Sequence, residues 1–153
     1  MQNLQRDPIF LLHDVARIMR TRFDQWARQY GLTRAQGVIL VRLERQPGLS
    51  QNEMAAICEV EPITVGRLVD RLETRGLIER RADPTDRRVR RLHLRPAAKP
   101  VLADIQAYKA ELTEMLTAGL PPKAVETMVD VLLHMKNRLT TEAVDEPIAA
   151  AGE

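Results

Sequence analysis

The sequence has a single cysteine, Cys58, and no long apolar run in its 153 residues. One cysteine can form no internal disulfide and supplies no CxxC pair, which excludes a disulfide framework and argues against a cysteine-based zinc site. No stretch approaches the ~18 apolar residues that a membrane-spanning helix needs, and the N-terminus lacks a secretory signal pattern. We therefore expect a cytoplasmic protein with no membrane partner.

Catalytic motifs are absent as well. The sequence contains no glycine-rich phosphate loop, no HExxH and no GxSxG pattern, and its histidines, His13, His93 and His134, are too scattered to predict a metal cluster. We therefore predict no enzyme activity, no cofactor and no metal.

Charge is present but unevenly distributed. The net charge is only +2, yet residues 80–95 hold seven arginines against two acids, whereas residues 111–153 hold three basic residues against eight acidic ones. A concentrated basic segment on a nearly neutral protein favours one surface for an anionic partner such as nucleic acid. The alternative is a solvated hairpin that uses its charge only against aggregation.

Apolar periodicity predicts six helices and one β-hairpin. Cap residues, prolines and glycines bound the helices, at Asp7–Pro8, Gly31, Thr33–Gln36, Ser50–Glu53, Glu61–Pro62, Gly76, Pro96 and Pro121–Pro122. Residues 77–81 and 89–94 read as strands on either side of a turn-rich segment. Two short helices joined by a tight turn, followed by a basic hairpin, are typical of a winged helix-turn-helix. The predicted fold class is therefore mainly α with a small β-hairpin wing and a helical dimerisation region.

The helices outside this module carry apolar residues at alternating three- and four-residue steps, as in a coiled-coil seam. Such a seam requires a partner, and we expect it to be a second copy of the chain, giving a homodimer. The expected organisation is an N-terminal dimerisation helix (1–31), a DNA-binding winged helix-turn-helix domain (32–95), C-terminal dimerisation helices (96–140) and a flexible tail (141–153).

The hairpin segment resembles the wing signature of the MarR family. Its motifs are Leu77-Ile78-Glu79-Arg80, Asp83-Pro84-Thr85-Asp86-Arg87-Arg88 and Arg91-Leu92-His93-Leu94, and the order of helices and wing covers about residues 8–140. The resemblance implies a homodimeric transcription factor, usually a repressor, that binds pseudopalindromic double-stranded DNA. It also implies release of the DNA by a small aromatic or phenolic anion. Arg95-Pro96 departs from the Leu-Thr common in the family, which leaves the cap of the fifth helix open.

The resemblance assigns DNA-binding roles by position. Arg88 matches the wing-tip arginine that enters the minor groove, and Asp86 matches the acid that holds the wing loop. Hydroxyl and guanidinium groups on the exposed side of the fourth helix are suited to bases and phosphates. The predicted DNA-binding residues are Ser50, Gln51, Thr64, Arg67, Arg71, Arg75, Asp86, Arg87, Arg88 and Arg90. For Arg67 and Arg71, pairing with Asp70 or Glu73 on the same helix remains the alternative.

An effector site is predicted on the first helix. Arg17 and Arg20 lie in a segment similar to one in SlyA-type members of the family, where basic residues face the effector carboxylate. With them we place Trp26 and Gln36. Two alternatives stay open: the arginines pair with the acidic last helix of the partner copy, and Trp26 belongs to the core.

Two other functions are considered. The winged fold can serve as a protein–protein interaction module without DNA, in which case association with DNA is weak and indifferent to sequence. Alternatively, the chain is a redox-responsive regulator that uses Cys58. Against the second function, Cys58 follows Ile57 on a helix expected to pack inside the winged domain, where a free cysteine is usually an inert small hydrophobe.

Overall fold

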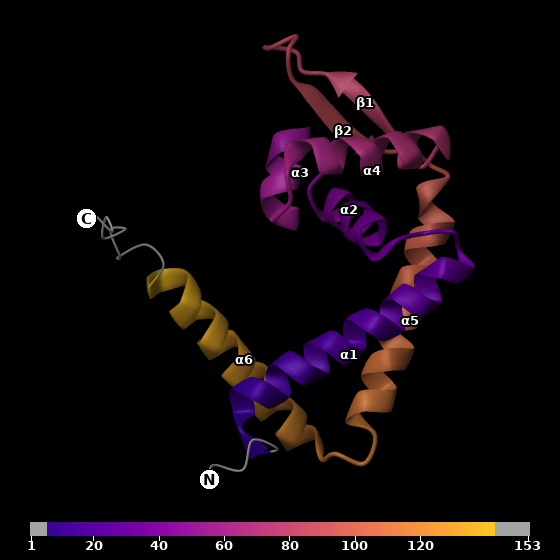
Figure 1. Cartoon of the computed structure of the whole chain (residues 1–153). Coiled ribbons are helices and arrows are strands. Elements are labelled where there is room, and N and C mark those ends of the chain that lie inside the picture. The colour runs from indigo at the N-terminus through magenta and orange to yellow at the C-terminus, as the bar shows by residue number, and fades with distance from the viewer. Residues whose placement is uncertain (1–5, 143–153) are drawn as a thin grey trace, which may run out of the picture. The chain divides into compact units, whose positions relative to one another are not determined.

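A computed structural model describes residues 6–142 of the chain (Figure 1). These residues belong to two compact units, which divide within helix α5 after residue 107 and are described separately below. The element order is α1 (Pro8–Gln29), α2 (Arg34–Arg45), α3 (Gln51–Cys58), α4 (Pro62–Thr74), β1 (Ile78–Ala82), β2 (Arg90–Leu94), α5 (Ala98–Thr117) and α6 (Pro122–Glu142). The prediction of six helices and one hairpin is confirmed. None of the helices described is long and apolar enough to cross a membrane.

Local sequence signals explain where the first helices begin. The Asp7 carboxylate accepts hydrogen bonds from the backbone N–H groups of Ile9 and Phe10, at 2.9 and 3.0 Å. Thr33 and Ser50 each head a complete capping box, so the second and third helices start where the spacing predicted.

The chain turns at residues with positive φ after α1 and α4, and backbone hydrogen bonds form the turn before α5. Gly31 and Gly76 follow α1 and α4 with φ of +65° and +69°, values that a side chain disfavours. At the Arg95-Pro96 junction, the Ala98 N–H donates to the Arg95 carbonyl at 2.9 Å. A backbone turn therefore leads into α5 at this junction.

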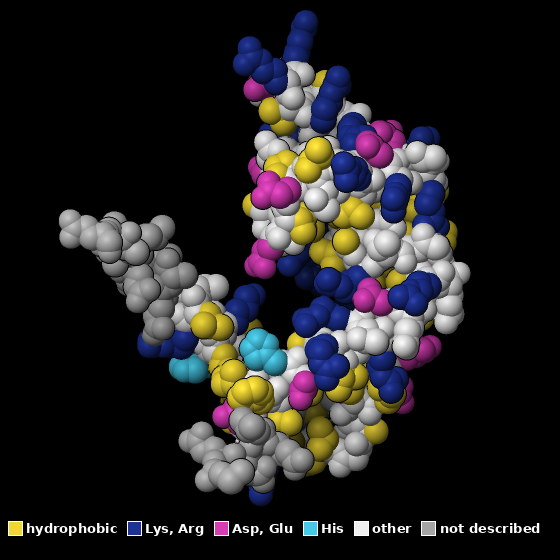
Figure 2. All heavy atoms as spheres, viewed as in Figure 1, with side chains coloured by type: hydrophobic (Ala, Val, Ile, Leu, Met, Phe, Trp, Pro, Cys, Tyr) yellow, Lys and Arg dark blue, Asp and Glu magenta, His cyan; other side chains and the backbone are white. Residues whose placement is uncertain are grey.

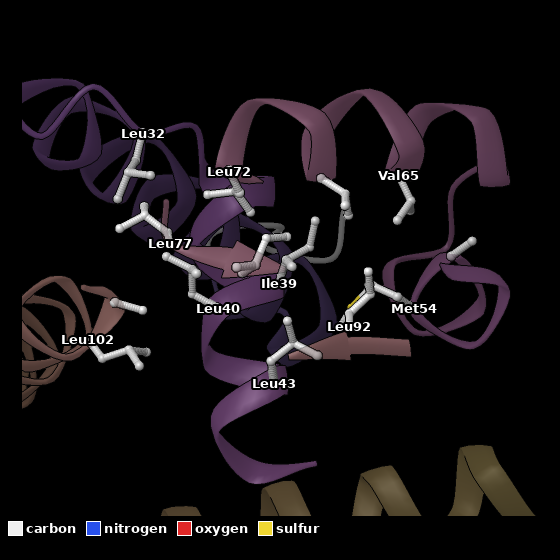
Figure 3. Close-up of a cluster of buried hydrophobic side chains, with 14 of the residues drawn as sticks. Leu32, Ile39, Leu40, Leu43, Met54, Val65, Leu72, Leu77, Leu92 and Leu102 are labelled. Atoms are coloured by element: carbon white, nitrogen blue, oxygen red, sulfur yellow. The ribbon is translucent and has the colours of Figure 1, made fainter. Parts of the chain in front are cut away.

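The first unit contains one apolar core between α2, α3, α4 and the hairpin (Figure 3). Its largest fully buried side chains are Ile39, Leu40, Leu43, Met54, Val65, Val69, Leu72, Ile78 and Leu92. Burial of each such side chain contributes about 1.5–3 kcal/mol. Because helices and hairpin share this core, they form one rigid support for whatever α4 and the hairpin expose.

Parts of α1 and α5 also enter this core, which the apolar seams did not predict. Ala27 near the end of α1 is completely buried, with Phe23 and Trp26 half-buried against the core. Ala98 and Leu102 at the start of α5 are buried in it as well. One end of each of these two helices therefore belongs to the core of the winged module.

The hairpin is antiparallel and is joined to the segment before α3. Ile78 pairs with Leu94, and Ala82 pairs with Arg90. The Leu92 N–H donates to the Leu49 carbonyl at 2.8 Å, and Ser50 forms a bridge with Arg91. The hairpin root is thereby held by backbone hydrogen bonds on both edges of β2.

The second unit contains the end of α5 together with α6. None of its residues from 108 to 141 is buried, and α6 exposes apolar side chains along its length, among them Val131, Leu133 and Leu139. A helix with an apolar face gains most of its stability from packing of that face against other elements. These exposed apolar side chains lie on one of the helices to which apolar periodicity assigned a coiled-coil seam.

Candidate nucleic-acid interface

Helix α4 exposes three polar residues on the side away from its core stripe. Thr64, Arg67 and Arg71 are exposed, and their three- and four-residue spacing places them on one side of the helix. Within residues 6–142, the side chains of Arg67 and Arg71 form no ion pair. The alternative of pairing with Asp70 or Glu73 is not observed, because both acids contact a different arginine.

That arginine is Arg80 on β1, whose side chain is 22% exposed. Its guanidinium donates to Asp70 and to Glu73, each at 2.6 Å, and also to the carbonyl of Gly66 at 3.3 Å. Its own N–H donates to Glu73 at 3.1 Å. Arg80 therefore fixes the hairpin to α4 and neutralises the two acids on that helix. Sequence reasoning counted it only as one of the basic residues of the wing, although its place in GLIxR marked the position.

Ser50 and Gln51, predicted to bind DNA, are both half-buried and engaged at the start of α3. The Ser50 N–H donates to Glu53 Oε2 at 2.7 Å, and its hydroxyl accepts from the Glu53 N–H at 3.2 Å. These Ser50 hydrogen bonds, assisted by the charge of Arg91, hold the pKa of Glu53 below its usual range. The Gln51 amide donates to the Pro62 carbonyl at 3.4 Å and accepts from Arg80. Both side chains therefore join α3 to its neighbours.

The wing loop is organised by Asp83, which is only 8% exposed. Its Oδ1 accepts from the Thr85 N–H at 2.7 Å, the Thr85 hydroxyl at 2.6 Å and the Asp86 N–H at 3.0 Å. Hydrogen bonds from Thr85, then from Arg91 and the Asp86 backbone, hold the pKa of Asp83 far below its usual range. The sequence assigned loop support to Asp86 alone, whereas the Asp-Pro-Thr-Asp spacing is the signal of an Asx turn centred on Asp83.

Arg91 on β2 connects this loop to α3. Its Nε donates to Asp83 Oδ2 at 2.7 Å, and its Nη1 donates to Glu53 Oε2 at 3.1 Å and to the Gly48 carbonyl at 3.2 Å. The hydrogen bond to Asp83 and the charges of both acids raise the pKa of Arg91. Like Arg80, it is a supporting arginine that the count of basic residues could not distinguish from the others.

The tip of the wing presents the remaining arginines to solvent. Asp86 Oδ1 accepts from the Arg88 N–H at 2.9 Å, so Asp86 does shape the end of the loop. Arg87, Arg88 and Arg90 are exposed, and basic side chains project from the hairpin tip at the top of Figure 2. In the portion of the chain described by the structure, these three side chains form no ion pair. They are charges available to an external anion.

Arg75, also predicted to contact DNA, has partners within the chain. Its two terminal nitrogens donate to the carbonyls of Gly31 and Tyr30, both at 2.9 Å. The guanidinium thereby ties the end of α4 to the turn between α1 and α2. This geometry indicates a structural role for Arg75.

The residues predicted to bind an effector do not converge. Arg17, with its side chain 63% exposed, pairs with Asp14 at 3.1 Å, and Arg20 is exposed one turn later. Trp26 follows Arg17 by nine residues, which at 3.6 residues per turn places it on the opposite side of α1. The arginine pair and the tryptophan therefore face different directions on this helix.

Trp26 and Gln36 have contacts of their own. The Trp26 ring lies between Phe23 and Tyr30, with centroids 5.4 and 4.6 Å away. Gln36 is 3% exposed, and its side chain accepts from the Thr33 N–H at 2.9 Å to complete the capping box of α2. These contacts are those of core and cap residues.

Cys58 lies at the end of α3 and is half-buried. Burial raises the pKa of its thiol, and the nearby charge of Arg42 only partly opposes this effect. A raised pKa disfavours the reactive thiolate, so the geometry does not favour the redox alternative. Among residues 6–142, no group of three or more histidine, cysteine or acidic side chains is placed to hold a metal ion.

Comparison with known proteins finds similarity to one family of regulators. Residues 32–89, from α2 through the wing loop, match the model of the MarR family. Over these residues the chain is similar to the MarR family. The uncharacterized HTH-type transcriptional regulator YybA of Bacillus subtilis (strain 168) is 29% identical over 103 residues, which are 67% of this chain and 68% of YybA.

Solved structures of family members are similar over most of the chain. A MarR-family transcriptional regulator from Rhodococcus sp. RHA1 is 28% identical with a TM-score of 0.75, covering 88% of this chain and 96% of its own. The S. aureus MepR–DNA complex is 25% identical with a TM-score of 0.73, covering 91% of this chain and 99% of MepR. The chain therefore has the fold of DNA-binding transcriptional regulators, and the proteins to which it is similar are regulators and not enzymes.

Proposed function

We propose that this regulator acts in the cytoplasm as a homodimer that binds pseudopalindromic double-stranded DNA and represses transcription. The observation that carries the proposal is that the arginines of α4 and the hairpin form two groups, one paired with acids inside the protein and one exposed to solvent. Arg80 and Arg91 neutralise the acids beside α4 and the wing, whereas the arginines at the wing tip and on the exposed side of α4 form no ion pair with any residue that the structure describes. The similarity to a protein solved in complex with DNA supports the same conclusion.

Helix α4 and the wing would contact different parts of the DNA. Thr64 and Arg67, in the N-terminal half of α4, would reach base edges in the major groove, and Arg71 would contact a phosphate. Arg88 would enter the minor groove, whose narrow, negatively charged form suits a weakly hydrated guanidinium.

The remaining predicted residues divide between contact and support. Arg87 and Arg90 would add phosphate contacts at the wing. Ser50 and Gln51 would contribute mainly by positioning α3 and α4. We assign Arg75 to the support of α4 and leave it out of the DNA surface.

The apolar residues left exposed in one copy support dimerisation. In α1, Phe10 is 56% exposed and Val15 46%, and in α6 Leu139 is 72% exposed. Sedimentation at low micromolar concentration should therefore show a dimer, because such stripes are unstable in water without a partner. A folded monomer at that concentration would overturn this part of the proposal.

The decisive experiment is selection of bound duplexes from random DNA, followed by affinity measurements on the selected operator and a scrambled duplex. A repressor should prefer the operator by a factor of about 10³ or more at physiological salt. Equal affinity for both duplexes would contradict sequence-specific binding and favour the protein–protein alternative. Reporter transcription from the operator, with and without the protein, then separates repression from activation.

We further propose that a small aromatic or phenolic anion releases the DNA by binding near Arg17 and Arg20. Since Trp26 and Gln36 are engaged elsewhere, the site depends on these two arginines. Arg17→Ala should weaken the response of the protein–DNA complex to aromatic acids, with DNA affinity in their absence nearly unchanged. Arg28→Ala, an exposed arginine in the last turn of the same helix, is the matched control. An unchanged response in Arg17→Ala would remove this residue from the site.

A further inference from the structure

One large apolar side chain in the first turn of α4 lies on the side of the helix opposite to the core. Ile63 is 66% exposed, and among the described residues of the first unit no large apolar side chain is more exposed. The buried residues of the same helix are Val65, Val69 and Leu72. At 3.6 residues per turn, Ile63 lies about 160° around the helix from Val65, whose side chain points into the core (Figure 3). Ile63 therefore points away from the core.

Ile63 lies on the side of α4 that is proposed to face DNA. Arg67 follows it one turn along the helix, only about 40° further around, and Thr64 is the adjacent residue. All three side chains are exposed. The spacing also places Asp70 near this side, and its carboxylate accepts a hydrogen bond from Arg80 at 2.6 Å. The isoleucine is therefore surrounded by polar and basic groups whose charge suits a nucleic acid.

Neither helix formation nor the core explains an isoleucine at this position. A β-branched side chain loses rotamer freedom in a helix, so its helix propensity is lower than that of alanine. The first turn of a helix favours acidic residues, and the first turn of α4 contains none. Ile63 also lies outside the apolar core of the first unit. Its side chain therefore contributes little to the fold and is available to an external surface.

We propose that Ile63 determines specificity by packing against the 5-methyl group of a thymine in the major groove, an inference that rests on the proposed function. In that groove the base edges offer hydrogen-bond donors, acceptors and one apolar group, the thymine methyl. Isoleucine neither donates nor accepts, so the methyl is the base-edge group that it can cover without leaving a polar atom unpaired. The N-terminal residues of a recognition helix reach the base edges, which agrees with the place of Ile63 in the first turn.

This contact would discriminate thymine from cytosine. Cytosine lacks the methyl group and presents an amine donor where thymine presents a carbonyl acceptor. Covering that amine with Ile63 would remove its hydrogen bond to water and supply no partner in return. Thr64 and Arg67 would read bases through hydrogen bonds, whereas Ile63 would read one base through an apolar contact. The three residues would therefore specify neighbouring positions of each half-site by different interactions.

The test uses the selected operator and replaces the thymines of one half-site, one at a time, by deoxyuridine, which lacks only the 5-methyl group. For the full-length wild type, one such replacement should weaken binding by about fourfold, the effect of exposing one methyl-sized apolar group. Ile63→Ala should bind the unmodified operator more weakly than the wild type and should bind both duplexes equally, because groups in contact give non-additive effects. Fluorescence anisotropy measures the affinities. A melting curve should match that of the wild type, since Ile63 is exposed and alanine favours the helix.

The matched control is Thr64→Ser, which removes only a methyl group from the adjacent residue and should keep the sensitivity to loss of the thymine methyl. Arg87→Ala should weaken binding through the wing and keep the same sensitivity. Loss of the sensitivity in Thr64→Ser rather than in Ile63→Ala would assign the methyl contact to Thr64 and overturn the proposal. Tight operator binding by the wild type without sensitivity at any thymine would overturn it as well, while the proposed function would stand. Failure to select any operator would overturn both.

Discussion

The strands and the tip of the hairpin use arginine in opposite ways. In the strands, Arg80 and Arg91 are partly buried, and each contacts two carboxylates. At the tip, Arg87 and Arg88 are exposed and form no ion pair with any residue from 6 to 142. The difference follows from strand register, which directs the first two toward acids on α3, α4 and the loop. A count of basic residues therefore overstates the DNA-binding surface, because part of the charge builds its support.

The largest difference between tip and strands should appear on substitution of Arg88. Arg88→Ala should weaken operator binding by roughly 1–3 kcal/mol, about 5- to 150-fold, and reduce the preference for narrow AT-rich flanks. Its thermal midpoint should stay that of the wild type, since the side chain is exposed and forms no ion pair with the described part of the chain. Fluorescence anisotropy and a melting curve measure the two quantities. Arg28→Ala, which removes one charge outside the proposed surface, is the control, and an equal loss of affinity there would contradict a specific role.

Arg80 should show the converse behaviour. Arg80→Gln should lower the free energy of unfolding by roughly 1–2 kcal/mol, because it breaks two ion pairs whose acids are themselves partly exposed. Operator affinity should fall only a few-fold, since the freed Asp70 carboxylate lies between Arg67 and Arg71. Urea denaturation checks the stability change. Arg81→Gln, which breaks an exposed pair on the same strand, should change stability by less than about 0.5 kcal/mol; equal effects of the two substitutions would contradict the distinction.

Much of the fold could be predicted from sequence because its signals are local. The capping boxes at Thr33 and Ser50 and the glycine after α4 act over a few residues, and they bounded the helices correctly. The participation of α1 and α5 in the core was not predicted. Ala27 and Leu102 fit a dimer seam and a domain core equally well, because periodicity states which side is apolar but not what covers it.

The candidate site was less predictable because its decisive contacts are long-range. The family motif located the exposed residues of α4 and the wing. It gave no means to distinguish Arg91 from Arg88, since the acidic partners of Arg91 lie up to 38 positions away in sequence. Arg75 illustrates the same limit: its exposed helical position indicated a DNA contact, whereas its carbonyl partners lie 44 and 45 residues earlier.

The pH dependence of stability should show how much the hydrogen-bonded Asp83 carboxylate contributes to the fold. Its pKa in the folded protein lies well below the unfolded value of about 3.9. A depressed folded pKa stabilises the fold fully above the unfolded pKa, and this contribution is lost as the pH falls through the folded pKa. Wild type should therefore be more stable than Asp83→Asn by a constant amount above about pH 5. The difference should shrink below about pH 4 in urea titrations; a difference that persists unchanged at pH 3 would contradict it.

The smallest effect is expected for Arg71, which shares the exposure of the wing-tip arginines but lies on α4. A phosphate contact is one released counterion, so Arg71→Ala should weaken operator and scrambled duplexes alike and reduce the slope of log affinity against log salt by about one. Near physiological salt the loss should be only a few-fold, because the contact is screened. Arg67→Ala is the matched comparison on the same side of α4: as a base contact, it should relax specificity at one position in each half-site. If Arg71→Ala instead relaxes specificity at one position and leaves the salt slope unchanged, the two arginines have the opposite roles. The unpaired charges of α4 would then read bases toward the C-terminal end of the helix, leaving phosphate contacts to Arg67 and the wing.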